Sequence, residues 1–184
     1  MEKLRNKEVW NGEHKGIQYE IVHWYLGWNY YIILPVAQIP ESRRKTFILK
    51  SRKSEFNLER TWEEYESAPI ISDLDWHGGI TDYEKIFGQV VLNDSIEVRV
   101  TSIKMGCDYM HLFDENRHYT LDVVKSDAEH SVDKLLELVP DMKIRCHWNG
   151  HYYNRDEGMV MPNGSFLANE NKGKMKETVK KYSI

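Results

Sequence analysis

The hydrophobic pattern in the first half of the chain predicts β-strands. Residues 17–34 predict a β-hairpin, because an alternating apolar and polar strand, a turn at Gly27 and Asn29, and an apolar run follow one another. Residues 96–103 alternate again, with isoleucine and valine on one face and glutamate, arginine and threonine on the other. This second stretch predicts another strand, with an apolar face and a polar face.

The strongest helical pattern lies later in the chain. Residues 121–138 carry apolar side chains at three- and four-residue steps, which is the period of a helix with one buried face. Thr120 is a suitable N-cap, and Pro140 cannot continue a helix. Residues 57–66, which are rich in glutamate, predict a short helix, and residues 170–182 predict a polar terminal helix.

Turn residues organise the segment after residue 140. Asn149-Gly150 and Asn163-Gly164 each predict a tight hairpin turn. Residues 147–153 have the composition of a ligand-binding hairpin tip, although aromatic cross-strand pairs in an ordinary hairpin are the more frequent reason. Strands interrupted by two or three helices predict an α+β fold with a largely antiparallel sheet. Since no linker or repeat divides the chain, we expect one domain over residues 1–184.

Charge and composition narrow the range of partners. The longest apolar stretch, residues 30–37, is too short to cross a bilayer, so we expect no membrane partner. The formal net charge of −4 disfavours duplex nucleic acid, which needs many phosphate contacts from lysine and arginine. A small anionic ligand needs only a few local cations. The two cysteines, Cys107 and Cys146, do not make a disulfide framework and favour a reducing cytoplasm.

Two compositional features favour a nucleotide-like ligand. Six Trp and eleven Tyr outnumber five Phe, and although core packing accounts for most of them, such rings also form base-stacking pockets. Six lysines and arginines lie between Arg43 and Lys53 without an intervening acid. The forked guanidinium groups of Arg43 and Arg44 suit phosphate, whereas a solvated surface is the usual alternative.

The most distinctive segment runs from Asp75 to Thr81. Gly78 and Gly79 let the backbone approach a ligand closely, or simply serve a turn that needs positive φ. His77 adds a donor or acceptor, and Trp76 adds a flat surface. A functional role and a purely structural one are equally consistent with this segment.

A second polar segment follows the strand at 96–103. His111 could form a metal site with His77, Asp108 and Asp114, and Cys107 could act as a nucleophile. No spacing here matches a known ligand set, and a buried, inert thiol is the commoner state of such a cysteine. We therefore expect no catalytic set, no metal and no cofactor.

These two segments resemble motifs of a large group of small tailed-phage proteins. The matching motifs are His77-Gly78-Gly79-Ile80-Thr81 and Gly106-x-Asp108-x-x-His111, and the likeness covers residues 17–139. The apolar-Pro step at Leu34-Pro35 and the helix opening at Thr120-Leu121 are similar as well. Within this group the chain resembles the phage anti-CBASS sponge proteins, which sequester cyclic dinucleotide immune signals without cleaving them.

The resemblance implies a non-enzymatic homo-oligomer that binds a cyclic dinucleotide such as 3',3'-cGAMP in the host cytoplasm. The alternatives are a nucleotide or phosphoester hydrolase that uses His77 and His111, and a phage accessory protein that binds a host protein. The expected ligand-binding residues are Trp76, His77, Gly78, Gly79, Thr81, Asp108, Tyr109, His111, Arg43 and Arg44.

Overall fold

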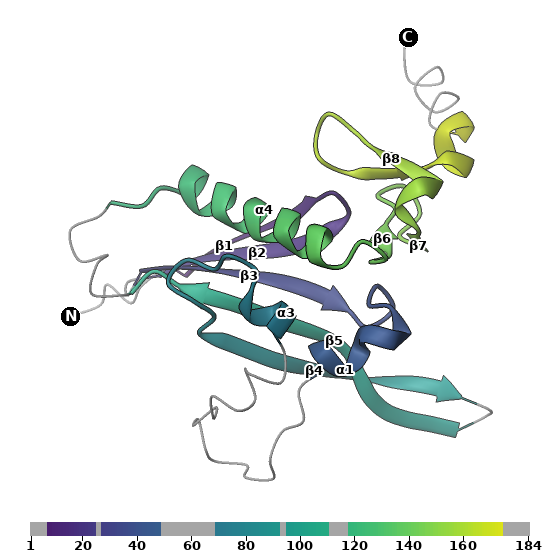
Figure 1. Cartoon of the computed structure of the whole chain (residues 1–184), viewed down its shortest axis with the longest axis horizontal. Helices are drawn as coiled ribbons and strands as arrows, with labels where there is room; N and C mark the ends of the chain where they lie inside the picture. Colours follow the sequence, from purple (N-terminus) through teal and green to yellow (C-terminus); the bar gives the residue numbers. More distant parts are fainter. Residues whose placement is uncertain (1–6, 25–26, 49–68, 93–94, 111–117, 175–184) are drawn as a thin grey trace.

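The computed structural model describes residues 7–24, 27–48, 69–92, 95–110 and 118–174. Its centre is a five-stranded antiparallel sheet in the order β1-β2-β3-β5-β4 (Figure 1). The strands are β1 (Glu8–His14), β2 (Ile17–Trp24), β3 (Gly27–Pro35), β4 (Asp82–Leu92) and β5 (Ser95–Asp108). The predicted α+β fold with a largely antiparallel sheet is therefore confirmed.

The helix α4 (Leu121–Leu138) covers the central strands and spans the residues predicted from the sequence. Its N-cap is Thr120, whose side chain accepts a hydrogen bond from the Val123 backbone. Its buried side chains meet alternate residues of β2, β3 and β5, and Tyr30 of β3 bonds to Ser131 of the helix at 2.8 Å. The helix and the sheet thus share one core.

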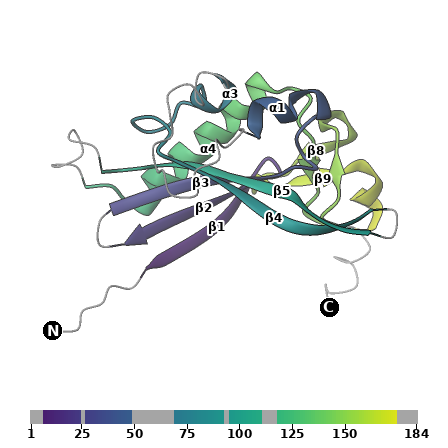
Figure 2. The same ribbon diagram turned by 90° about the horizontal axis from the view of Figure 1, so that it is seen from below.

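Three short helical segments lie on the same side of the sheet as α4 (Figure 2). They are η1 (Glu41–Arg43), α1 (Arg44–Phe47) and α3 (Pro69–Ser72). Phe47 and Ile71 are fully buried, and the Tyr83 hydroxyl of β4 donates to the Phe47 carbonyl at 2.8 Å. The helix predicted over 57–66 falls outside the described residues.

The C-terminal part forms two small hairpins that pack beside the β1–β2 turn. Its elements are β6 (Ile144–Arg145), β7 (Tyr152–Tyr153), η3 (Arg155–Glu157), β8 (Gly158–Val160), β9 (Phe166–Ala168) and η4 (Asn169–Asn171). Cys146 forms a parallel bridge to Phe166, which joins the two hairpins. The Arg145 backbone N–H donates to the Gly16 carbonyl at 3.2 Å, so the hairpins are anchored to the main sheet.

Several details differ from the sequence-based predictions. Gly27 and Asn29 both lie within β3 rather than in the turn. The Asn149-Gly150 hairpin closes through a six-residue connection between β6 and β7. The Asn163-Gly164 turn is confirmed, since it connects β8 to β9. The predicted terminal helix extends beyond the described residues, and only η4 and the residues directly after it represent it. None of the helices described is long and apolar enough to cross a membrane.

Candidate functional site

The two sequence motifs lie side by side in the fold. The Thr81 backbone N–H donates to the Gly106 carbonyl at 3.0 Å, and the Asp108 N–H donates to the Thr81 hydroxyl oxygen at 3.0 Å. Asp108 in turn accepts a hydrogen bond from the Met110 N–H at 3.0 Å. Thr81 and Asp108 therefore fasten the two loops to each other. His111 lies outside the described residues, so its placement near His77 stays a prediction.

His77 belongs to a compact aromatic cluster, which we call the His77 cluster and which consists of His77, Tyr109 and Tyr119. The imidazole stacks on Tyr109 with ring centroids 4.0 Å apart and planes inclined by 7°. Tyr119 meets the same imidazole edge-on at 5.3 Å. The Tyr109 hydroxyl donates to the Asp127 carboxylate of α4 at 2.6 Å. The cluster therefore ties both motifs to the helix.

Burial controls the ionisation of the groups around this cluster. Burial raises the pKa of Tyr109 far above its usual value, and the hydrogen bond to Asp127 raises it further. Burial also raises the pKa of the Cys107 thiol to about 12. The thiol is therefore protonated at neutral pH, which removes support for Cys107 as a nucleophile.

Trp76, Gly78 and Gly79 take different positions in the loop. Only 7% of Trp76 is exposed, and its indole N–H donates to the Ile71 carbonyl at 2.6 Å. Trp76 is thus a core residue, and little of its ring remains for a ligand. Gly78 and Gly79 are exposed and have positive φ angles of 69° and 105°, which L residues with side chains rarely adopt.

The arginine pair lies away from the motifs. The Arg43 guanidinium is 3.2 Å from the Asp141 carboxylate, just beyond the C-terminal end of α4. Asp127, which accepts a hydrogen bond from Tyr109 of the His77 cluster, lies in the N-terminal half of α4. At a rise of ~1.5 Å per residue, it lies ~16 Å along the helix from Leu138 at the C-terminal end. Arg44 follows Arg43 in α1 and is half-buried. The ion pair with Asp141 therefore holds Arg43 at the end of α4 opposite to the His77 cluster.

The described residues contain no group of three or more His, Cys, Asp and Glu side chains that could hold a metal ion. His111 and Asp114, which belong to the alternative metal set, fall outside these residues.

A second candidate site lies between the two C-terminal hairpins. We call it the hairpin hollow; its volume is about 310 Å³. It is lined by His147, Trp148, Met161, Pro162, Asn163, Ser165 and Leu167. Most of this lining is apolar, and it includes one indole and one imidazole.

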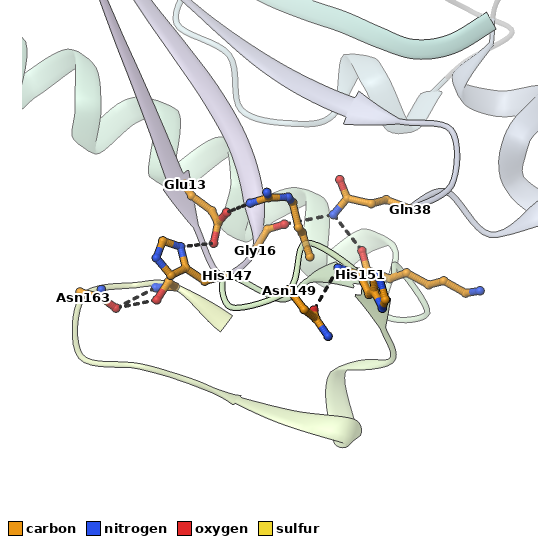
Figure 3. Close-up of polar contacts among 10 residues, drawn as sticks. Glu13, Gly16, Gln38, His147, Asn149, His151 and Asn163 are labelled. Carbon is orange, nitrogen blue, oxygen red and sulfur yellow. Dashed lines mark hydrogen bonds and ion pairs between the residues drawn. The ribbon is translucent and has the colours of Figure 1, made fainter. Parts of the chain in front are cut away.

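Local hydrogen bonds hold the walls of the hairpin hollow in place (Figure 3). The His147 N–H donates to the Phe166 carbonyl at 2.9 Å, which fixes one wall to β9. In the β8–β9 turn, which also lines the hollow, the Asn163 side-chain oxygen accepts from the Ser165 N–H at 3.2 Å and from its hydroxyl at 2.8 Å. The hollow is therefore formed by backbone and turn geometry without the need for a ligand.

Glu13 of β1 sets the charge at the edge of the hairpin hollow. Its carboxylate accepts from the Arg145 guanidinium at 3.0 Å and lies 3.9 Å from the His147 imidazole (Figure 3). The Glu13 side chain is only 14% exposed, whereas that of His147 is 66% exposed. One carboxylate thus faces two groups that are able to donate to an anion.

The sequence indicated this second site only in part. The composition of residues 147–153 and the Asn163-Gly164 turn were both apparent. The convergence of the two hairpins depends on the bridge between Cys146 and Phe166, and no sequence pattern marks that bridge.

Comparison of the chain with models of protein families, with curated proteins and with solved structures finds no match.

Proposed function

We propose that this chain binds a cyclic dinucleotide and releases it unchanged, with one base of the ligand in the hairpin hollow. The observation that carries the proposal is the hollow itself. Its volume of about 310 Å³ is at the lower end of the range for small-molecule pockets. A space of this size accepts one purine base, while the rest of a cyclic dinucleotide would remain outside.

The lining of the hairpin hollow suits the flat face of a base. Trp148 lines the hollow and is 42% exposed, so part of its ring is available for stacking. A base stacked on an aromatic side chain gains about 1–3 kcal/mol. Met161, Pro162 and Leu167 supply the remaining apolar contacts, which tolerate different bases.

The polar groups at the rim suit a phosphate. His147 projects a largely exposed imidazole, and Arg145 donates to the same Glu13 carboxylate that lies beside this imidazole. A ligand phosphate would accept charge-assisted hydrogen bonds from these donors in competition with Glu13. The overall negative charge does not oppose such binding, because only local cations are needed.

The hydrolase alternative has less support. It relies on His77 and His111, and His111 lies outside the described residues. One ring face of the His77 imidazole is occupied by Tyr109. Thr81 and Asp108 make the hydrogen bonds that fasten their own loops.

Calorimetric titration with a panel of cyclic dinucleotides tests the proposal. We expect Trp148→Ala to weaken binding about tenfold or more, since each 1.4 kcal/mol corresponds to about a tenfold change in affinity. Trp24→Ala is the matched control, because Trp24 and Trp148 are exposed to 40% and 42%, and Trp24 lies on β2 and does not line the hollow. Its affinity should equal that of the unaltered chain.

Two results would contradict the proposal. The first is that no cyclic dinucleotide binds with a dissociation constant below about 100 μM, which corresponds to about −5.5 kcal/mol. That result would favour the alternative in which the protein binds a host protein. The second is a loss of affinity in His77→Ala but not in Trp148→Ala, which would move the ligand from the hairpin hollow to the Gly78-Gly79 loop.

A further inference from the structure

The strands β4 and β5 continue beyond the rest of the sheet as a two-stranded ribbon (Figure 1). The register between β3 and β5 ends at the pair Pro35 and Ser102, whereas β4 and β5 stay paired as far as Leu92 and Ser95. We call residues 87–92 and 95–100 the arm. An isolated ribbon of two strands is marginally stable in water, so the arm is expected to pack against something.

One face of the arm is almost entirely apolar. The cross-strand pairs on this face are Phe87 with Val100, Gln89 with Val98, and Val91 with Ile96. Four of these side chains are among the most exposed apolar groups described: Phe87 at 60%, Val91 at 72%, Ile96 at 67% and Val98 at 69%. A contiguous exposed apolar surface of this kind marks an interaction site.

The apolar face continues the side of the sheet that the helices cover. Phe87, Gln89 and Val91 alternate in phase with Tyr83 along β4, because the register shift after Ile86 leaves its extra residue, Thr101, in β5. Tyr83 faces the helices, because its hydroxyl donates to the Phe47 carbonyl in α1. The arm therefore extends the buried surface of the sheet beyond α1.

The charges of the arm lie on its other face. Glu97 and Arg99 point away from the apolar face and pair with each other at 2.7 Å. A nucleic acid, a charged peptide or an anionic membrane would find no charge to pair with on the apolar face. An uncharged face also lets two copies of an acidic chain approach each other without local repulsion.

The chemistry of Gln89 favours a second copy of this chain as the partner of the apolar face. It belongs to the middle pair of the apolar face and is its one polar side chain. An apolar partner would bury this amide without hydrogen bonds, which is costly. An amide both donates and accepts, so two Gln89 side chains that meet across a two-fold axis satisfy each other.

We propose that two copies of this chain form a symmetric dimer through the apolar faces of their arms, with the two Gln89 residues close to the two-fold axis. The proposal rests on the arm alone and does not depend on the nucleotide ligand. The dimer covers the exposed side chains of both arms and leaves Glu97 and Arg99 in solvent.

Sedimentation velocity over a concentration series tests the dimer. We expect the unaltered chain to sediment at twice the mass of one chain. Val98→Lys places a charge in the interface and should raise the dissociation constant at least about tenfold. Val90→Lys is the matched control, because it makes the same change on the opposite face, where Glu97 is the cross-strand neighbour. It should leave the dimer intact.

Cysteine pairing provides a test that does not weaken the interface. Gln89→Cys should form a disulfide-linked dimer in mild oxidant, whereas Val90→Cys should not. Both native cysteines are buried, so they do not compete. A monomer at every concentration, equal effects of the two lysine variants, or equal cross-linking of the two cysteine variants would each overturn the proposal.

Discussion

Removal of the Tyr109 hydroxyl gives a stringent test of how the two motifs are held together. The hydroxyl donates to the Asp127 carboxylate at 2.6 Å, and the ring stacks on His77 at 4.0 Å. A hydrogen bond to a charged group contributes about 1.5–3 kcal/mol. Because this contact is only partly buried, Asp127 regains water when the hydroxyl is lost. We expect Tyr109→Phe to lower the free energy of unfolding by about 1.5 kcal/mol, near the lower end of that range.

Tyr109→Ala also removes the ring on which His77 stacks. Loss of a large buried aromatic side chain costs about 3–5 kcal/mol, so this variant should be markedly less stable than Tyr109→Phe. Urea denaturation, followed by far-ultraviolet circular dichroism, measures both changes. Tyr152→Phe is the control, since the Tyr152 hydroxyl has no hydrogen-bond partner among the described residues. A loss below about 0.5 kcal/mol in Tyr109→Phe, or equal losses in the two Tyr109 variants, would refute the reasoning.

Alkaline pH and two glycine positions give further predictions. Burial raises the pKa of Tyr31 and of Cys107 to about 12. Their contribution to stability is therefore complete below about pH 9 and is lost as the pH rises towards 12. The urea concentration at the unfolding midpoint should fall between pH 8 and pH 12. Gly106→Ala should lower the free energy of unfolding by about 3 kcal/mol or more, because an added Cβ would lie 2.2 Å from the Tyr30 carbonyl oxygen. Gly79→Ala should cost only about 1–2 kcal/mol in the same assay, since its Cβ meets no atom within 4 Å and only the positive φ is strained.

The central elements of the fold could be predicted because their burial follows a simple period. In β2, β3 and α4 the buried side chains recur at every second residue or at every third and fourth residue. One face of each element is covered, so the sequence carries a regular alternation that is readable without the structure.

The two edge strands β1 and β4 could not be predicted in this way. In β1 the apolar residues Val9 and Trp10 are adjacent, and Gly12 breaks the apolar pattern at a position where a Cβ would lie 2.2 Å from the Tyr19 ring. In β4 the apolar residues Ile86 and Phe87 are adjacent, and the register with β5 shifts there because Thr101 of β5 is passed over in the pairing. Neighbours in space, rather than any pattern in the chain, decide that these segments are strands.

The sequence indicated which residues are candidates for the site, but not where each of them lies in the fold. The two motifs do meet, but the positive φ of Asp75, at 53°, belongs to a turn after which Trp76 is buried in the core. Trp76 was predicted to bind a ligand because the amino-acid sequence does not reveal this turn. Likewise, Arg43 is held by Asp141, which is distant in sequence and lies at the other end of α4.

Recovery of the bound nucleotide tests the central claim most directly. The purified chain is mixed with a cyclic dinucleotide and passed through a desalting column, and the retained complex is then digested with protease. Chromatography of the released material identifies the ligand. We predict stoichiometric retention by the unaltered chain, loss of retention in Trp148→Ala, and release of the cyclic dinucleotide with both phosphodiester bonds intact. Release of a linear or hydrolysed nucleotide, or no retention at all, would contradict the account.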